Sequence, residues 1–303
     1  MKHSQLPAKI GVADFDALHD AAPAWRGVIE AIAAAHSSEQ VRQVSEGTVL
    51  VALIGQQQVL KLYPPFLRDH FEFEAAALQA LSGRLSLPTP RFLARGEYQG
   101  WPYLLMSQLQ GQTLTRVWPE LDAKRQCELL SSLGALAAQV HALSVGALSS
   151  FAPDWGDFVV AQRAGCLRRQ QRTGLPAHLL AHLPDFMQGE LPQGPDVILT
   201  GEYTPMNLMV QDGRLCGMFD FGDGLVGPRE YDWLGPLCFL GAGSAARVEA
   251  FFQGYGFIPD VEQRQALMRL LLLHRYSHLG LQIAMPGWQS ARSFEELAAL
   301  IWP

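Results

Sequence analysis

Two polar residues at the ends of a short apolar hairpin have the chemistry of a magnesium site. Asn207 precedes the apolar segment 208–211, and Asp220 follows the apolar segment 214–219. Between the two segments stands Asp212-Gly213, which is typical of a two-residue β-hairpin turn. An amide oxygen and a carboxylate suit a hard cation such as Mg²⁺, which leaves its other positions to water and phosphate.

The turn also predicts a register for the two strands. If Gln211 pairs with Arg214, Asn207 falls opposite Met218 and lies one side-chain alternation from Asp220. The two candidate metal ligands are therefore expected to be neighbours. The alternative for each residue alone is structural: Asn207 caps a strand and Asp220 begins a turn.

The residues on either side of the hairpin extend this candidate site. Asp220-Phe221-Gly222-Asp223 follows the second strand, and we expect Gly222 to provide the sharp turn that lets Asp220 face a ligand. The loop 201–207 precedes the first strand and carries Glu202, five residues before Asn207. Glu202 is thus a candidate acid or base at the same cavity.

Lys61 interrupts the apolar strand 59–63, and Glu74 lies on the apolar face of the helix that follows. An edge strand whose lysine reaches water would explain Lys61 by itself. A carboxylate on a buried helix face, however, needs a partner, and Lys61 on the adjacent strand is the obvious one. An ion pair of this kind can hold an ammonium group against nucleotide phosphates.

The elements around these residues form two regions of different character. β-Prone runs at 49–54, 59–63 and 101–106, with a helix at about 70–82, predict a strand-rich first lobe. Helical periodicity then dominates, and helices are expected from about 123, at 157–172, 245–255, 261–281 and 294–301. The predicted boundary divides the chain into residues 1–106 and 107–303, joined near Ser107, Gln108 and Leu109.

Composition narrows the possible partners and location. The 303 residues are 49% hydrophobic and 17% charged, with a formal net charge of -6, which favours neither nucleic acid nor an anionic membrane and mildly favours a cationic substrate. The four cysteines are widely spaced and predict neither a zinc site nor disulfides. Without a signal-like or membrane-spanning apolar run, the protein is expected in the cytoplasm, and the sequence indicates no oligomeric state.

Taken together, these residues resemble the aminoglycoside phosphotransferase family, small-molecule kinases related in fold to protein kinases. In that family a strand lysine pairs with a helix glutamate, as Lys61 and Glu74 would here. The catalytic loop of the family, His-Gly-Asp followed by Asn, is matched by Thr200-Gly201-Glu202 followed by Asn207. The resemblance implies an α+β, two-lobed protein-kinase-like fold, with a small antiparallel sheet in the N-lobe and a larger, mainly helical C-lobe.

The resemblance also implies a nucleotide bound between the lobes and Mg²⁺ held by Asn207 and Asp220. ATP or GTP would be the co-substrate, with its base bonded to backbone near Ser107, Gln108 and Leu109. The short loop around Gly47 would cover the phosphates, although a single glycine in a polar turn is equally typical of an ordinary turn.

Further family features are matched in the second lobe. Asp232 would brace the catalytic loop, and His141 corresponds to a helix-ending Leu-His segment for which a structural hydrogen-bonding role is expected.

Two departures from the family pattern concern the catalytic loop itself. Thr200 stands where the family has histidine, and Glu202 stands where it has the aspartate base. The extra methylene moves the carboxylate by about one bond, which matters in positioning-dependent catalysis. Since the lysine pair and both metal ligands are retained, we expect retained catalysis with Glu202 as the base.

The predicted function is therefore transfer of a γ-phosphate to a hydroxyl of a small molecule, such as an aminoglycoside, another antibiotic or a metabolite. Three alternatives remain open at this stage: a nucleotide-binding module without transfer activity, transfer of a nucleotidyl group, and a metal-dependent hydrolase built on Asp220, Asp223 and Asp232. A hydrolase should tolerate loss of Lys61, whereas a kinase should not.

Overall fold

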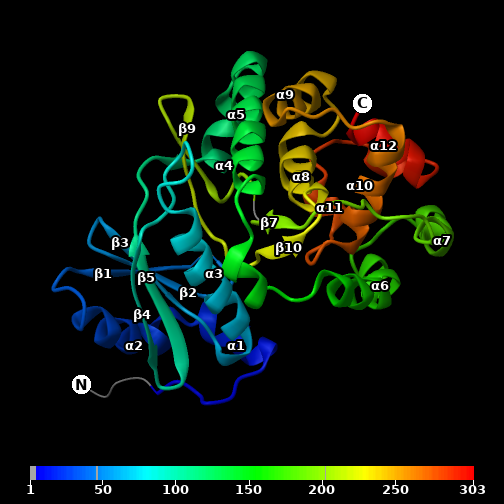
Figure 1. Cartoon of the computed structure of the whole chain (residues 1–303). Coiled ribbons are helices and arrows are strands. Elements are labelled where there is room, and N and C mark those ends of the chain that lie inside the picture. Colours follow the sequence, from blue (N-terminus) through cyan, green and yellow to red (C-terminus); the bar gives the residue numbers. More distant parts are fainter. Residues whose placement is uncertain (1–4, 46, 202) are drawn as a thin grey trace. The chain divides into compact units, whose positions relative to one another are not determined.

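β-Branched and leucine-rich segments near the N-terminus pair into one antiparallel sheet (Figure 1). The computed structural model describes residues 5–45, 47–201 and 203–303. It divides the chain into two compact units: residues 1–84, 88–110 and 219–222 form unit 1, and residues 85–87, 111–218 and 223–303 form unit 2. The segment 219–222 thus belongs to unit 1, although both of its neighbours in the sequence belong to unit 2.

Unit 1 contains a five-stranded antiparallel sheet of order β1-β2-β3-β5-β4 and three α-helices. The strands are β1 (Val41–Val44), β2 (Leu50–Ile54), β3 (Gln58–Leu62), β4 (Phe92–Tyr98) and β5 (Trp101–Ser107). The helices are α1 (Val12–Asp20), α2 (Ala22–Ala34) and α3 (Arg68–Leu81). The small antiparallel sheet expected in the N-lobe is confirmed.

The core of unit 1 is formed by one face of this sheet and the two N-terminal helices. Leu60 and Leu62 of β3 lie in the same buried cluster as Trp25, Val28 and Ile29 of α2. Because side chains alternate across a strand, Lys61 lies on the opposite face. The alternation in β3 therefore separates core-forming leucines from a residue that can do chemistry.

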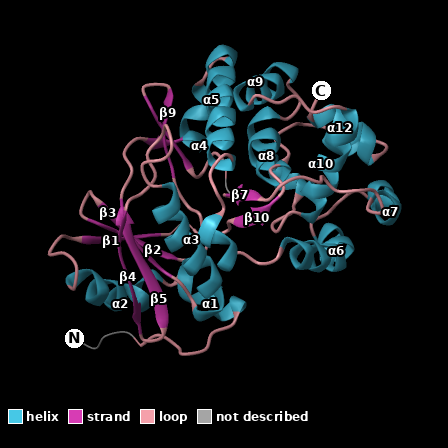
Figure 2. Ribbon diagram, viewed as in Figure 1, coloured by secondary structure: helices cyan, strands magenta, loops and turns pink. Residues whose placement is uncertain are grey.

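Unit 2 is mainly helical, with two small sheets (Figure 2). One sheet has the order β6-β8-β9 and the other pairs β10 with β7. The strands are β6 (Gln112–Thr113), β7 (Val197–Leu199), β8 (Leu208–Gln211), β9 (Arg214–Met218) and β10 (Leu225–Gly227). The helices are α4 (Leu114–Val117), α5 (Ala123–His141), α6 (Trp155–Arg172), α7 (Ala177–Phe186), α8 (Glu230–Pro236), α9 (Ala245–Tyr255), α10 (Val261–Leu273), α11 (Leu279–Gln282) and α12 (Phe294–Ile301).

The single helix expected at 261–281 is wrong. α10 ends at Leu273, and the next residue, His274, has an extended backbone with ψ 142° before the chain turns into α11. The leucine periodicity is continuous through this region, but the backbone leaves the helix where Arg275 and Tyr276 form tertiary hydrogen bonds.

Glycines allow α5 and α9 to pack closely in unit 2. A Cβ on Gly134 of α5 would overlap the carbonyl oxygen of Phe251, and one on Gly254 would overlap that of Ser131. We expect Gly134→Ala to lower the free energy of unfolding by at least about 2 kcal/mol, because the helices must separate to admit the methyl group. Urea denaturation measures the change.

Gly165→Ala is the matched control for this prediction. Gly165 also lies inside a helix, but the nearest atom to an added Cβ is 3.7 Å away, at the flexible end of Arg169. The alanine should be neutral or stabilising there, by up to about 1 kcal/mol. Equal effects at both positions would contradict the packing explanation.

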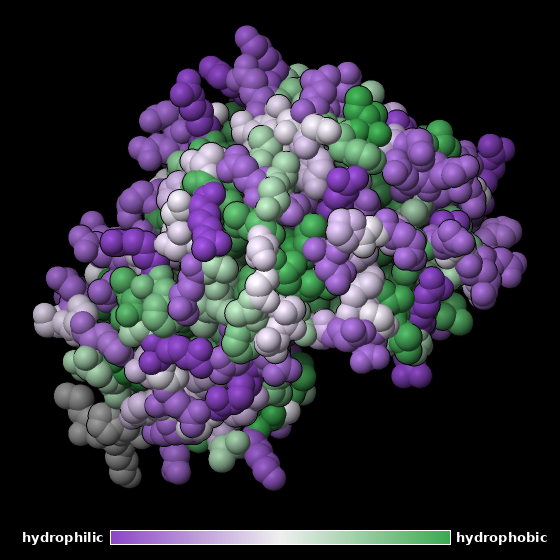
Figure 3. All heavy atoms as spheres, viewed as in Figure 1, coloured by the Kyte–Doolittle hydropathy of each residue, from purple (hydrophilic) through white to green (hydrophobic). Residues whose placement is uncertain are grey.

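Hydrophilic residues, drawn in purple, cover much of the face visible in Figure 3, and hydrophobic residues, drawn in green, gather in patches between them. No helix within residues 5–45, 47–201 and 203–303 is long and apolar enough to cross a membrane.

Candidate functional site

β3 and α3 bring Lys61 and Glu74 together inside unit 1. Lys61 lies on the face of β3 opposite Leu60 and Leu62, and Glu74 lies on the buried side of α3 with Phe71. Lys61 is 7% exposed and Glu74 is 0% exposed. Their side chains form the ion pair expected from the sequence, with Lys61 Nζ 2.7 Å from Glu74 Oε1 and 2.9 Å from Oε2.

Asp220 shares the same ammonium group. Lys61 Nζ donates a hydrogen bond of 2.8 Å to Asp220 Oδ1, and the Phe221 amide points at Glu74 Oε1 from 3.4 Å. The segment 219–222 is held in unit 1 by these contacts and by the buried ring of Phe221. Lys61 of β3 therefore bridges the carboxylate of Glu74 on α3 and that of Asp220, which lies 159 residues after Lys61 in the chain.

The pKa values of Lys61 and Glu74 depend on burial and on the neighbouring charges. Burial alone would lower the pKa of the Lys61 ammonium, but the negative charges of Asp220 and Glu74 outweigh it and raise that pKa above its usual range. Burial raises the pKa of the Glu74 carboxyl, while the Lys61 charge acts in the opposite direction. Lys61 is therefore a fixed positive charge at neutral pH.

The backbone at the start of this segment is left-handed at Asp220. Asp220 has φ 68°, in the left-handed region that only asparagine, aspartate and glycine visit readily, whereas Gly222 is not in that region. Gly222 lies in a turn with Asp223, as expected, and it needs no left-handed backbone there. Gly222 also packs beside Glu74, where an added Cβ would lie 3.4 Å from Oε2. The left-handed backbone leaves the Asp220 carboxyl side chain 34% exposed, so it can accept a ligand from solvent.

The segment expected to contact a nucleotide base, Ser107 to Leu109, ends β5 in unit 1. The Ser107 amide donates to Arg91 O at 2.9 Å, and the Gln108 amide donates to Gln57 O at 2.7 Å. The backbone N–H of Leu109 donates to no backbone carbonyl of the described residues. Of the three amides, Leu109 is the one able to donate to a ligand.

The loop expected to cover the phosphates is described only in part. Gly47 has φ 119°, a conformation that favours glycine, and follows Glu46, which lies outside the described residues.

In unit 2, Asp232 of α8 holds the start of the predicted catalytic loop. Its carboxylate accepts hydrogen bonds from the Thr200 amide at 2.9 Å and the Gly201 amide at 2.7 Å. His141 Nε2 lies 3.1 Å from the same carboxylate, and His141 Nδ1 lies 2.8 Å from the Tyr255 hydroxyl. Asp232 thus braces the loop, and His141 occupies the structural position expected for it. Glu202, the predicted base, lies outside the described residues.

The β8–β9 hairpin carries Asn207 at its open end. Asp212 and Gly213 have φ 52° and 72°, as a type I′ turn requires, and Gln211 pairs with Arg214 as expected. The register then shifts by one residue between Met209 and Val210.

This β-bulge overturns part of the predicted register. Leu208, and not Asn207, pairs with Met218, so the predicted pairing of Asn207 with Met218 is wrong. Asn207 is buried, and its backbone N–H donates to the backbone carbonyl of Thr204 at 3.1 Å. The structure places Asn207 in unit 2 and Asp220 in unit 1.

Comparison with known proteins decides the family. The model of the phosphotransferase enzyme family matches residues 37–267, which include Lys61, Glu74, Asn207 and Asp220. The chain belongs to this phosphotransferase family. A curated relative, aminoglycoside 3'-phosphotransferase from Escherichia coli, is 24% identical over 228 residues, covering 72% of this chain and 81% of the relative.

Solved structures of this phosphotransferase family share the fold. The GDP complex of wild-type aminoglycoside 2'-phosphotransferase-IIIa has a TM-score of 0.67 at 17% identity, covering 90% of this chain and 95% of that one. Macrolide 2'-phosphotransferase MphH from Brachybacterium faecium has a TM-score of 0.62 at 20% identity, covering 91% and 98%. The two-lobed kinase-like fold expected from the sequence is confirmed.

In this phosphotransferase, the aspartate after the Asp-Phe-Gly sequence has partners that the sequence analysis missed. Asp223 Oδ1 accepts from Arg275 Nη1 and from the Tyr276 hydroxyl, each at 2.8 Å. Gly201, with φ 69°, lies against Asp223 so closely that a Cβ would come within 2.8 Å of its carbonyl oxygen. Arg275 and Tyr276 thus lie beside the predicted catalytic loop, in the segment that follows the end of α10 at Leu273.

The neighbouring His274 is neutral. Burial, together with the charge of Arg275, lowers the pKa of His274 to about 4, and its ring stacks on Tyr231 at 4.9 Å. An imidazole in this state cannot supply a positive charge at neutral pH.

Two of the aspartates named in the hydrolase alternative, Asp223 and Asp232, have partners within unit 2. Asp232 binds the loop amides and Asp223 binds Arg275, and the described residues contain no group of three histidine, cysteine, aspartate or glutamate side chains able to hold a metal.

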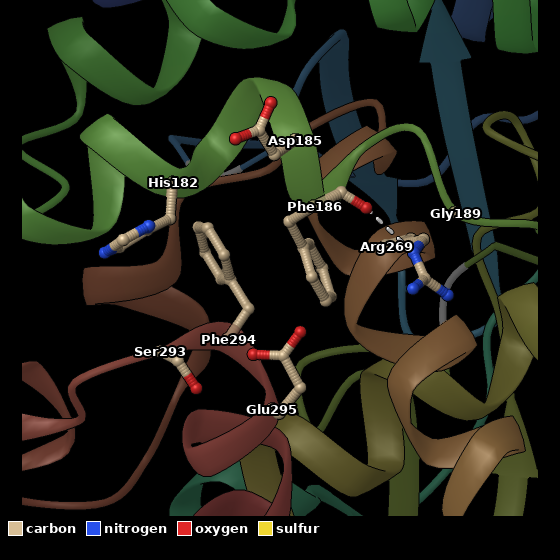
Figure 4. A pocket seen from close by; sticks show the side chains of 8 residues that line it. All are labelled: His182, Asp185, Phe186, Gly189, Arg269, Ser293, Phe294 and Glu295. Atoms are coloured by element: carbon tan, nitrogen blue, oxygen red, sulfur yellow. Dashed lines mark hydrogen bonds between the residues drawn. The ribbon is translucent and has the colours of Figure 1, made fainter.

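A cavity of about 360 Å³ lies elsewhere in unit 2 of this phosphotransferase, between α7, α10 and α12 (Figure 4). Phe186 and Phe294 stack at 4.7 Å along it, and Arg269 donates to the Phe186 carbonyl at 3.0 Å. Among the described residues, Lys61, Glu74, Asn207 and Asp220 do not line it. It is open to solvent and lined in part by the exposed side chains of His182, Asp185 and Glu295.

Proposed function

We propose that this phosphotransferase moves the γ-phosphate of a nucleoside triphosphate, ATP or GTP, to a hydroxyl of a small molecule. The observation that carries the proposal is the Lys61 ammonium bonded to both Glu74 and Asp220. A buried, permanently charged ammonium held on two sides can steady phosphate oxygens without reorganising.

The residues present fit a magnesium ion. Asp220 offers a partly exposed carboxylate, and Asn207 offers an amide oxygen, both hard ligands of the kind that Mg²⁺ prefers. Asp220 and Asn207 would hold the ion, which when bound supplies charge neutralisation on the phosphates. Lys61, oriented by Glu74, would hold the phosphates that are not transferred.

For the nucleotide base we propose recognition by the Leu109 amide. The Ser107 and Gln108 amides already donate to Arg91 and Gln57, which leaves Leu109 as the donor in the segment joining the proposed lobes 1–106 and 107–303. Gly47 would let its loop approach the phosphates, because glycine has no side chain and can adopt the positive φ found here.

The acceptor is proposed to be a hydroxylated antibiotic or metabolite. The curated relative is named for an aminoglycoside and one structural neighbour for a macrolide, both hydroxyl-bearing antibiotics. The net charge of -6 favours a cationic acceptor.

A panel of aminoglycosides, macrolides and hydroxylated metabolites, with Mg²⁺ and either ATP or GTP, tests the proposal. Mass spectrometry should find an acceptor that gains one phosphoryl group. A nucleotidyl adduct would replace the proposal by nucleotidyl transfer, and free phosphate without a modified acceptor would favour hydrolysis.

Glu202→Gln should reduce turnover by at least about 10²-fold, because general-base assistance is worth about 10² to 10⁴ in rate. Nucleotide affinity should change little, since the proposed role of Glu202 is to receive the proton of the acceptor hydroxyl. Steady-state kinetics with the acceptor found above measures both quantities.

Glu190→Gln is the control, because Glu190 has an exposed side chain on a connecting segment. Turnover of the Glu202 variant equal to that of wild type would remove Glu202 from the mechanism.

A further inference from the structure

Tyr63 stands next to the Lys61–Glu74 pair and is not part of the mechanism described above. It follows β3 directly and lies two residues after Lys61, so both side chains leave the same face of the sheet. Its side chain is 1% exposed, its amide donates to Pro102 O at 2.9 Å, and its ring packs edge-on against Phe71 with centroids 5.5 Å apart. Ring and backbone are therefore fixed, which fixes the direction of the hydroxyl.

The hydroxyl of Tyr63 donates a short hydrogen bond to Glu74 Oε2. Glu74 is fully buried, so its two oxygens depend on protein donors. Oε1 receives Lys61 at 2.7 Å and the distant Phe221 amide, while Oε2 receives Lys61 at 2.9 Å and Tyr63. Among the described residues, Tyr63 is the neutral side-chain donor to this carboxylate, beside the backbone amide of Phe221.

The orientation of Glu74 matters because Lys61 is shared. The ammonium also donates to Asp220 at 2.8 Å, so two carboxylates compete for its position. A carboxylate held only by the ammonium could follow that group toward Asp220. A carboxylate that is also held by a rigid phenol keeps the ammonium in place.

We infer that Tyr63 is a positioning residue for phosphoryl transfer: its hydroxyl holds Glu74 in the orientation that presents Lys61 to the nucleotide. The inference rests on the proposed function. The role requires a hydrogen-bond donor at the para position of the ring, and the ring alone does not fulfil it.

Tyr63→Phe removes the hydroxyl and keeps the ring. We expect the nucleotide Kd and the nucleotide KM to rise about five- to tenfold, because a hydrogen bond to a buried charged group is lost. The KM for the acceptor should stay within about twofold. Direct nucleotide binding and steady-state kinetics measure these values, and circular dichroism checks the fold.

Tyr103→Phe is the matched control. Tyr103 lies on β5 of the same sheet, and its hydroxyl bonds to His36 at 3.0 Å, outside the Lys61–Glu74 pair. Loss of this hydroxyl should leave the nucleotide Kd unchanged. Replacing Tyr63 by 4-aminophenylalanine, which keeps a donor at the para position, should restore the nucleotide Kd to within about twofold of wild type.

A double-mutant cycle with Glu74→Gln decides whether Tyr63 acts through Glu74. In the Glu74→Gln background, Tyr63→Phe should cause less than half of its effect in wild type, because the carboxylate that it orients is gone. The same fold-change in both backgrounds overturns the inference. So does an unchanged nucleotide Kd for Tyr63→Phe, or a failure of 4-aminophenylalanine to restore it.

The proposed function fails separately. If wild-type protein binds nucleotide but phosphorylates no acceptor, the proposed function is overturned while the nucleotide Kd values still decide the role of Tyr63. If wild-type protein binds no nucleotide, both are overturned.

Discussion

Replacing Asp220 by asparagine is expected to reduce phosphoryl transfer by at least about 10³-fold while the protein remains folded. Asparagine tolerates the left-handed backbone found at this position, with φ 68°, so the change removes the charge and keeps the turn. The missing carboxylate is the proposed ligand for Mg²⁺ and one of two anions on Lys61. Charge stabilisation of this kind is worth several kcal/mol of barrier, at about 1.4 kcal/mol per tenfold in rate.

Turnover measured across a Mg²⁺ titration, with thermal denaturation in parallel, checks this expectation. Asp212→Asn is a closely matched control, because Asp212 also has a left-handed backbone, with φ 52°, but lies on the exposed turn of the β8–β9 hairpin. That variant should transfer phosphate at the wild-type rate. Near-normal turnover of Asp220→Asn would remove Asp220 from the metal site.

Lys61→Met should lower turnover by at least about 10²-fold and also destabilise the protein. Methionine fills the same volume but leaves the buried Glu74 without its main partner, and breaking a buried ion pair in this way costs about 3 to 5 kcal/mol. Urea denaturation reports the stability, and initial rates at saturating nucleotide report the catalytic loss.

A second variant separates the two effects of Lys61. Lys61→Met combined with Glu74→Gln removes both charges, which should recover most of the lost stability but none of the activity. Arg68→Met serves as control, because Arg68 forms an exposed pair with Glu97 on the surface of the same unit. If the double variant regained activity along with stability, Lys61 would be a structural residue and the hydrolase alternative would regain support.

The sequence predicted best those features that depend on a few adjacent residues. Asp212-Gly213 predicted its turn because left-handed backbone is local chemistry, and Lys61 and Glu74 predicted their pairing because a carboxylate on a buried helix face needs a cation.

The features that failed depend on contacts between distant segments. The bulge in the β8–β9 hairpin lies where Gly111 packs closely against Val210 and Cys216. No pattern within the hairpin sequence indicates this contact. The break after Leu273 occurs where Arg275 reaches Asp223, about fifty residues earlier. Local periodicity continues through both places, so tertiary contacts decided the outcome.

The two N-terminal helices were not predicted, although the sequence contains signals for the second. The first third was expected to be β-rich, yet it begins with α1 and α2. Trp25, Val28, Ile29 and Ile32 have helical spacing, and Pro23 stands in the first turn of α2, where proline is favoured. These signals predict a helix and could have been read from the sequence.

The membership of residues 219–222 in unit 1 has a consequence for dissecting the protein. An N-terminal fragment ending at Gln110 would contain Lys61 and Glu74 but not Asp220, so its buried ammonium would lack one of its two anions. The complementary fragment would contain Asp220 and Phe221 without Lys61 and Glu74, the residues they bond to. Because residues 219–222 belong to unit 1, no single cut in the chain yields a fragment that contains Lys61 with both of its carboxylate partners and leaves out the rest of unit 2.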